Sequence, residues 1–288
     1  MWHGACNITV PTLRRRDNVL LKNSRNLILY GRLQGGPFTI KNPILPQTSI
    51  EITLRRSKDE FSLIRDKDTA KVSDKYKIVI HQCNLYVNRI QLGVNASFKV
   101  QKMFEENKYL LAMYPFTQCY LTRVLIPALS SSWHSVISTS LGGTPERLYV
   151  GIMDEHSING SNWENNPTIF PAAQYKVSSV QLYVNHVPVR ITPRETDFTN
   201  GDFLDSWMDT MQTIPVFKHG FTCGVTTDDY KNVYCLFGFE VKEMQSKSIE
   251  VEIAFSEPIP KPLLLVVLSY KDIKFALDSD GYFKHWQH

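Results

Sequence analysis

The stretch from Leu141 to Phe170 changes from turn-forming residues to an apolar run and then to polar residues, a pattern that few kinds of fold require. Glycines and Pro145 interrupt the chain just before the run 146–153 (ERLYVGIM), which is rich in the β-branched, aromatic and aliphatic residues typical of strands. The next residues, 154–166, are polar and carry Asn-Gly, Ser-Asn and Asn-Pro pairs that favour turns. The stretch therefore predicts a β-strand followed by a long loop, placed at a sheet edge or a contact surface.

Short runs with strand character recur along the rest of the chain. Apolar and polar residues alternate most clearly in 49–56 (SIEITLRR) and 248–255 (SIEVEIAF), which predicts strands with one buried face. The remaining predicted strands cover residues 26–33, 61–64, 76–90 with a bulge near 82–84, 118–126, 177–184, 232–241 and 263–274. A turn is predicted at residues 185–188, between two of these strands.

Two segments place their apolar residues at helical rather than alternate spacing. Residues 95–106 predict a surface helix whose first residue is the N-cap. In 202–211, Phe203, Trp207 and Met211 lie four apart and predict a second short helix with one apolar stripe. Because strands predominate and turns recur, the sequence predicts an all-β fold, an antiparallel sandwich or barrel rather than βαβ units.

Size and charge narrow the class of protein. A chain of 288 residues with 43% hydrophobic composition is long enough to bury a core, so disorder is not its main state. The net charge of +4 is only mildly basic, and basic residues are interspersed with acidic ones, which does not indicate a nucleic-acid-binding protein. This composition does not favour direct contact with nucleic acid. Any such contact would involve at most Arg14, Arg15 and Arg16, and a solvated face or a terminal arm is the simpler interpretation of these residues.

The cysteines and the apolar runs of the sequence indicate in which cellular compartment the protein is made. The five cysteines have neither the spacing of a zinc site nor that of a disulfide framework; they are Cys6, Cys83, Cys119, Cys223 and Cys235. No signal-peptide pattern opens the chain, and the longest apolar run, 262–269, is too short to span a membrane. The sequence therefore predicts a protein made in the cytoplasm or nucleus and not secreted, in which the glycosylation sequons at Asn7, Asn95 and Asn159 are chance occurrences.

The sequence shows no group of residues that meets the requirements of a catalytic, cofactor or metal site. The run Asp154–His156 is the best metal candidate, but consecutive strand residues point to opposite faces and do not converge on one ion. Asp228–Asp229 fits a turn with local side-chain capping better than an acid pair. Cys223 and His219 lack a third partner, and no nucleophile elbow or phosphate-binding loop is present. We therefore expect no enzyme activity, no cofactor and no metal.

Several phrases of the sequence, taken together and in order, resemble one protein family. They are 50–63 (IEITLRRSKDEFSL), 112–115 (AMYP), 145–151 (PERLYVG), 159–161 with 166–167 (NGS and NP), 229–230 with 236–239 (DY and LFGF), and 255–260 (FSEPIP). The family comprises jelly-roll capsid proteins of Maverick/Polinton elements and adintovirus-like viruses, together with uncharacterised animal genes derived from them. The resemblance covers roughly Asn26 to Asp278, and its specificity comes from the number and order of the phrases.

The resemblance implies an antiparallel jelly-roll sandwich, the second jelly roll of a double jelly-roll protein plus the last strands of the first. Residues 1–70 would be an N-terminal arm with those last strands, and residues 71–288 a jelly-roll domain with two short helices and long loops. Family members carry further residues in front that form most of a first jelly roll. Three alternatives stay open here: a truncated product, missing strands supplied by another polypeptide, or a single jelly roll with an N-terminal arm. Strands without partners should pair with the second domain or stay exposed at their edges.

The implied function is that of a virion structural protein, the major capsid protein, which assembles with itself into homotrimeric capsomers. Other capsid proteins, such as the penton, would be its further partners. The loop after Met153 and the helices at Asn95 and Asp202 are the expected contacts between subunits.

Two alternatives to a major capsid protein remain. One is a penton-type minor capsid protein with a single jelly roll. The other is a host-domesticated β-sandwich binding module, such as a carbohydrate or receptor binder, because a fold does not determine a function. Trp133, His134 and Trp163, expected in loops, would then form stacking platforms for the ligand.

Overall fold

The computed structural model describes residues 28–31, 33, 38, 40, 42–45, 50–56, 59, 77–106, 112–137, 145–156, 169–215, 224–241, 248–277 and 283–285. The strands are β1 (Ala112–Ile126), β2 (Ser132–Ile137), β3 (Arg147–Asp154), β4 (Val177–Val184), β5 (Val187–Pro188), β6 (Arg194–Glu195), β7 (Leu236–Glu240), β8 (Ile249–Phe255), β9 (Leu263–Leu277) and β10 (Phe283–His285). The helices are α3 (Val94–Glu106), α5 (Leu204–Thr213) and α7 (Thr227–Asn232).

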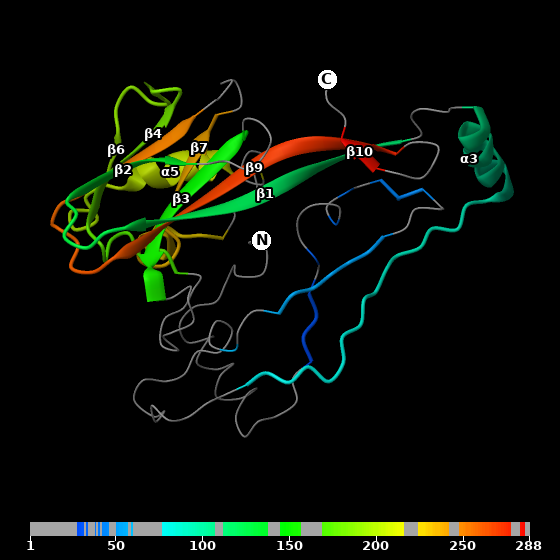
Figure 1. Cartoon of the computed structure of the whole chain (residues 1–288), viewed down its shortest axis with the longest axis horizontal. Helices are drawn as coiled ribbons and strands as arrows, with labels where there is room; N and C mark the ends of the chain where they lie inside the picture. The colour runs from blue at the N-terminus through cyan, green and yellow to red at the C-terminus, as the bar shows by residue number, and fades with distance from the viewer. Residues whose placement is uncertain are drawn as a thin grey trace.

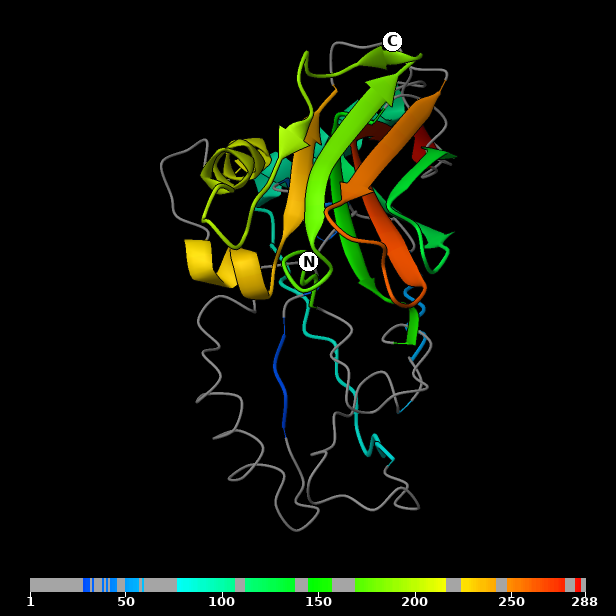
Figure 2. The same ribbon diagram turned by 90° about the vertical axis from the view of Figure 1, so that its left-hand side faces the viewer.

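The strands form two antiparallel sheets packed face to face (Figures 1 and 2). One has the order β1-β9-β3-β7 and the other the order β2-β8-β4-β5, while β10 pairs with β9 and β6 with β4. The pairs β1–β9, β2–β8, β3–β7 and β4–β5 are those of one long folded-over hairpin, and they fall alternately into the two sheets. This strand order is that of a jelly roll. The fold is therefore an antiparallel jelly-roll sandwich.

The core lies between the two sheets and follows from the alternation of side chains along the strands. Its members are fully or almost fully buried and come from both inner faces, for example Val150, Leu182, Phe237, Ile253 and Val267. On the β1-β9-β3-β7 sheet, a smaller cluster on the outer face adds a second apolar layer; it consists of Met153, Phe170, Leu236 and Val266.

Helix α5 covers the outer edge of β7. Thr210 Oγ1 donates a hydrogen bond to Leu236 O at 2.9 Å and accepts one from Gly238 N at 3.0 Å. These backbone groups lie at the edge of the sheet, so one helix side chain takes the place of a neighbouring strand. Gly238 allows the close approach, because a Cβ there would collide with Thr213 Oγ1 and crowd Thr210 Cα at 3.3 Å.

Most strand predictions from Leu141 onwards are confirmed. Strand β4 covers the predicted range 177–184, and β3, β8 and β9 start or end within a few residues of their predicted limits. Strand β1 begins at Ala112 rather than at 118, and includes Pro115, which an edge strand tolerates because its free side needs no donor. The turn at 185–188 is also confirmed, with left-handed backbone at Asn185 and His186 (φ 52° and 65°).

Both predicted helices are present, and a third was missed. Helix α3 begins at Val94, so Asn95 lies inside it and the prediction that Asn95 is the N-cap was wrong. In α5 the predicted apolar stripe is confirmed, since Phe203 and Met211 are buried and Trp207 packs against the core. Helix α7 occupies the start of the predicted strand 232–241, because a capping box at Thr226 favours a helical turn before β7 begins.

The strands predicted in the N-terminal part were wrong wherever the structure describes them. Residues 28–31, 50–56 and 77–92 are in no sheet, and they run outside the sandwich (Figure 1). Their alternation is compatible with strands, but a strand also needs the backbone of a neighbour, and no described segment provides one. The strand predicted at 61–64 lies outside the described residues, as does most of the long loop predicted after Met153.

Candidate functional site

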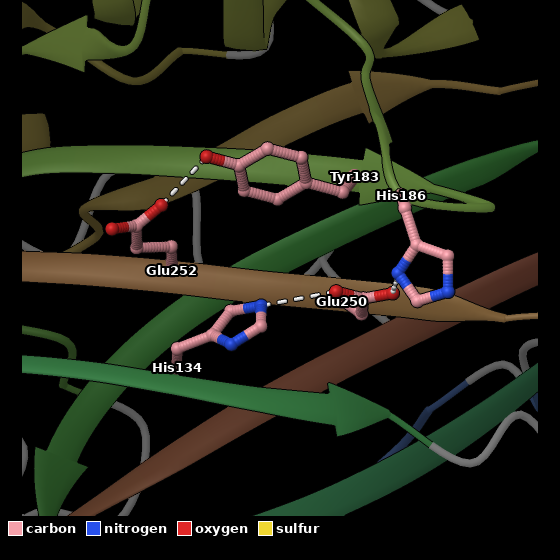
Figure 3. Close-up of a pocket in the computed structure, with 5 residues that line it drawn as sticks. All are labelled: His134, Tyr183, His186, Glu250 and Glu252. Carbon is pink, nitrogen blue, oxygen red and sulfur yellow. Dashed lines mark hydrogen bonds and ion pairs between the residues drawn. The ribbon is translucent and has the colours of Figure 1, made fainter.

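The outer face of the β2-β8-β4 sheet carries a cluster of polar side chains, which we call the polar cluster (Figure 3). They line an open pocket of about 300 Å³; the residues are His134, Tyr183, His186, Glu250 and Glu252. Strand β8 lies in the middle, paired with β2 on one side and β4 on the other. Since Ile249, Val251 and Ile253 point into the core, both glutamates point outward from the sandwich.

Cross-strand neighbours hold the two glutamates diagonally. Glu250 lies opposite Tyr183 on β4, and Glu252 lies opposite His134 on β2. The hydrogen bonds cross over: Tyr183 Oη donates to Glu252 Oε2 at 2.6 Å, and His134 Nε2 lies 3.1 Å from Glu250 Oε2. Each glutamate is therefore tied to a residue two positions away from its direct partner on the neighbouring strand, a diagonal reach that antiparallel pairs allow.

The turn between β4 and β5 brings a second imidazole to Glu250. Left-handed backbone at His186 swings its ring over β8, where Nδ1 lies 2.6 Å from Glu250 Oε1. This is an ion-pair distance without hydrogen-bond geometry, since Oε1 has no hydrogen-bond partner. Asn185 holds the turn, because its side chain accepts a hydrogen bond from Ser248 N at 3.2 Å. Two imidazoles thus lie on opposite sides of one carboxylate (Figure 3), and its side chain is only 6% exposed.

The chemistry of the polar cluster is that of a contact surface. The hydrogen bond to Glu252 raises the pKa of Tyr183, so the phenol keeps its proton and is not a base. Within the described part of the chain, no three His, Cys, Asp or Glu side chains are arranged to hold a metal ion. Carboxylates and imidazoles at an open surface can, however, make hydrogen bonds and ion pairs with a neighbouring molecule.

Only one member of this cluster was singled out from the sequence. His134 was expected in a loop beside Trp133, but both lie in β2, and Trp133 packs against the core instead of forming a platform. Trp163 lies outside the described residues. The alternation of residues 248–255 places both glutamates on the outward face, and this was the one signal for the site. It could not show that Glu250 is buried, because the covering imidazoles come from distant strands.

The best metal candidate of the sequence is instead part of an ion pair. Asp154 ends β3, and its carboxylate binds Lys261 Nζ and accepts a hydrogen bond from His156 N at 2.9 Å. Burial alone would raise the pKa of Asp154, but the hydrogen bonds from Lys261 and His156 outweigh it and lower the pKa below its ordinary value of 3.8. The contact joins the end of β3 to the residues that lead into β9.

Replacing Asp154 by asparagine should lower the free energy of unfolding by about 1 kcal/mol at pH 7. Because the folded-state pKa is lowered, the contribution is present above about pH 4 and is lost as the pH falls through the lowered value. Urea unfolding at pH 7 and pH 3 measures it, and the difference between the wild type and Asp154→Asn should be smaller at the lower pH. A double-mutant cycle with Lys261→Met isolates the pair, and additivity in that cycle would contradict the assignment.

The other candidates from the sequence have structural roles or lie outside the described residues. Asp229 forms the capping box of α7: its N–H donates to Thr226 Oγ1 at 3.1 Å and its carboxylate accepts from Thr226 N at 3.2 Å. The predicted local capping is therefore confirmed. Burial raises the pKa of the Cys235 thiol to about 12, so this cysteine is unreactive. Arg14, Arg15, Arg16, Cys6, His219 and Cys223 are not among the described residues.

The opposite face of the sandwich carries a different kind of surface. On the outside of the β1-β9-β3-β7 sheet, Leu121 and Leu125 of β1 are 53% and 49% exposed. They lie directly opposite Leu268 and Leu264 of β9, and we call these four side chains the leucine strip. Arg123 lies between the two leucines of β1 on the same face, opposite Val266. The leucine strip borders the free edge of β1, which pairs only with β9 among the described strands. Among the described residues, no helix is long and apolar enough to cross a membrane.

Comparisons with known proteins do not show a family for this chain. No protein-family model matches the chain. An uncharacterised protein of Caenorhabditis elegans is 22% identical over 219 residues, which cover 71% of this chain and 50% of that protein. The chain thus spans half the length of this curated relative.

Among solved structures, the chain is similar to virus capsid proteins. The PBCV-1 virus capsid is 6% identical with a TM-score of 0.38, over 62% of this chain and 52% of that one. The Sputnik virophage structure is 11% identical with a TM-score of 0.37, over 62% and 39%. The mavirus major capsid protein is 9% identical with a TM-score of 0.35, over 61% and 41%. At TM-scores below 0.5, the jelly-roll assignment rests on the strand order of the chain itself.

Proposed function

We propose that this chain is a structural protein of virus particles, a major capsid protein of the double jelly-roll lineage that acts by self-assembly. The observation that carries the proposal is the jelly-roll strand order, in which the family-like phrases of the sequence occupy framework positions. Residues 112–115 open β1, residues 145–151 lead into β3, and residues 236–239 are most of β7. These three phrases therefore coincide with strands of the jelly roll.

The surfaces of the sandwich support assembly as the mode of action. A closed ring of identical subunits uses two different patches on each copy. The sandwich exposes two that differ in character: the leucine strip on one sheet and the polar cluster on the other. We propose that these patches lie in contacts between subunits of a homotrimeric capsomer and between capsomers or pentons in the virion.

The helices expected from the sequence to make contacts differ in what they expose. Helix α3 lies away from the sandwich (Figure 1), with Val94 and Phe98 largely exposed one turn apart. Helix α5 uses most of its apolar surface against β7 and leaves Leu204 and Met208 partly exposed. We therefore propose α3 as the more important of the two in subunit contacts.

The division of the chain belongs to the same proposal. Residues 1–70 would supply an N-terminal arm and the last strands of a first jelly roll, and residues 71–288 the second. The strands predicted at 49–56 and 76–90 pair with no described residue, which is compatible with strands whose neighbours lie outside the described part of the chain. The next experiment separates this arrangement from a self-sufficient single jelly roll.

The mass of the 288-residue protein in solution tests the function. Light scattering behind a sizing column should show a trimer when the protein is co-expressed with the polypeptide encoded immediately upstream, and no trimer without it. A stable assembly of the chain alone would instead indicate a single jelly roll and a penton-type minor capsid protein. A protein that stays monomeric at high concentration under both conditions would overturn a capsid function.

A further inference from the structure

The N-terminal segments 50–56 and 77–92 have a surface unlike that of the sandwich. They lie outside it in both views (Figures 1 and 2) and are in no sheet with any described residue. Large apolar side chains along them are more than half exposed; these are Ile50, Leu54, Val79, Ile80, Leu85, Tyr86, Val87 and Ile90. Apolar side chains exposed in such number, on backbone without a ladder, mark a surface that a partner covers.

Side chains hold the two segments together at one point, Ile78. Its N–H donates a hydrogen bond to Asp59 Oδ1 at 3.1 Å, and its carbonyl accepts one from Arg56 Nη1 at 3.3 Å. Arg56 and Asp59 also form an ion pair with each other. Hydrogen bonds from Arg56 and from the Ile78 N–H lower the pKa of Asp59, so its carboxylate remains an acceptor at neutral pH. In a sheet, the donor and acceptor of Ile78 would bind a neighbouring strand, and here two side chains take that place.

The backbone decides what kind of partner can cover residues 79–92. A helix or an apolar ligand could bury the side chains but would leave the N–H and C=O groups unpaired, at a cost for each. An extended polypeptide satisfies both at once, as in strand addition to an open edge. The strands of the sandwich lie elsewhere (Figure 1), so no strand in the described part of the chain is available as the partner. The matched relative of C. elegans has as much sequence again outside the match.

We propose that Arg56 and Asp59 form a backbone clamp on Ile78, and that the clamped segment 77–92 pairs with an extended strand of a further polypeptide rather than with a second copy of this chain. The inference rests on the proposed function, because it names a partner that this chain would need in the assembled capsid protein. The clamp sets the register: a shift of one residue would turn the side chains of the segment to the opposite face.

Variants of the intact 288-residue chain test the clamp. Arg56→Ala and Asp59→Ala should each speed amide hydrogen exchange at Ile78 severalfold, whereas Asp59→Asn keeps an acceptor oxygen and should retain much of the protection. Arg55→Ala is the matched control, because Arg55 is an exposed arginine of the same segment, next to Arg56. The exchange rate is read residue by residue by NMR, so a general loss of structure would appear as faster exchange in the sandwich as well.

A charge reversal separates a backbone clamp from a simple ion pair. The double variant Arg56→Asp with Asp59→Arg keeps opposite charges together but presents the donor to the N–H of Ile78 and the acceptor to its carbonyl. A clamp is not restored by this exchange, so fast exchange at Ile78 should persist. Slow exchange in the reversed variant, or unchanged exchange in Asp59→Ala, would overturn the proposal.

Co-expression with the polypeptide encoded immediately upstream tests the partner. Amides of residues 79–92 should then become protected, and Asp59→Ala should reduce the yield of the complex while Arg55→Ala should not. A complex that forms without protecting 79–92 overturns the inference and leaves the capsid function standing. Protection of 79–92 without trimers or particles supports the inference and contradicts the capsid function. Protection that rises with the concentration of the chain alone would identify a second copy as the partner and overturn the proposal.

Discussion

Replacing Arg194 by methionine should lower the free energy of unfolding by about 3 kcal/mol, and the melting temperature by about 6–12 °C. The side chain is 6% exposed and joins three parts of the fold. Its guanidinium donates to Gly238 O in β7, lies 3.6 Å from Asp209 Oδ2 of α5, and stacks over the Phe239 ring at 4.1 Å. Methionine keeps much of the volume but leaves a buried carbonyl and a carboxylate without this cation.

The loss of stability should come from the buried contacts of Arg194 with β7 rather than from its ion pair with Asp209. Burial lowers the pKa of Arg194 to about 10, which leaves the side chain charged at neutral pH. Arg190 pairs with the same carboxylate of Asp209 but is 39% exposed, so Arg190→Met is the matched control and should cost less than about 1 kcal/mol. Thermal and urea unfolding of the two variants measure the difference. Equal losses would show that the Asp209 ion pair, rather than the buried contacts to β7, provides the stability.

Replacing both Leu121 and Leu125 by glutamate should abolish the trimer while leaving the sandwich folded. The two side chains are already about half exposed in the single chain, so folding loses little when they become charged. At a contact between subunits, each buried leucine would contribute about 1.5–3 kcal/mol, and two glutamates would add uncompensated buried charge. The trimer should therefore dissociate at concentrations at which the wild type is fully assembled.

Light scattering of the co-expressed protein measures this loss, with the melting temperature as a check on folding. Ile191→Glu is the matched control, because Ile191 is 99% exposed and lies outside both proposed surfaces. It introduces one glutamate at an exposed position and should leave the trimer intact. A trimer that withstands the leucine substitutions would place the subunit contacts elsewhere, and helix α3 would then be the next surface to change.

The jelly roll shows which parts of the fold short-range patterns encode. Alternation in residues 248–255 predicted β8 closely, because the two faces of a strand differ wherever one side meets the core. Strand character in residues 177–184 predicted the bounds of β4. The same alternation at 50–56 predicted a strand that is not formed. A pattern of side chains reports which face can be buried, but the strand forms only when another backbone lies beside it.

The same distinction between local pattern and tertiary contact applies to the candidate site. By itself, the sequence determined most of the longer strands of the sandwich, the outward direction of Glu250 and Glu252, and the capping at Asp229, because each depends on neighbours a few residues away. Only the tertiary structure decided that Glu250 is buried between His134 and His186, since these residues come from three separate strands and turns. It also decided that Arg194 and Thr210 close the edge of β7. Such contacts join residues far apart in the chain, and the pairing of the strands, which no local pattern records, brings them together.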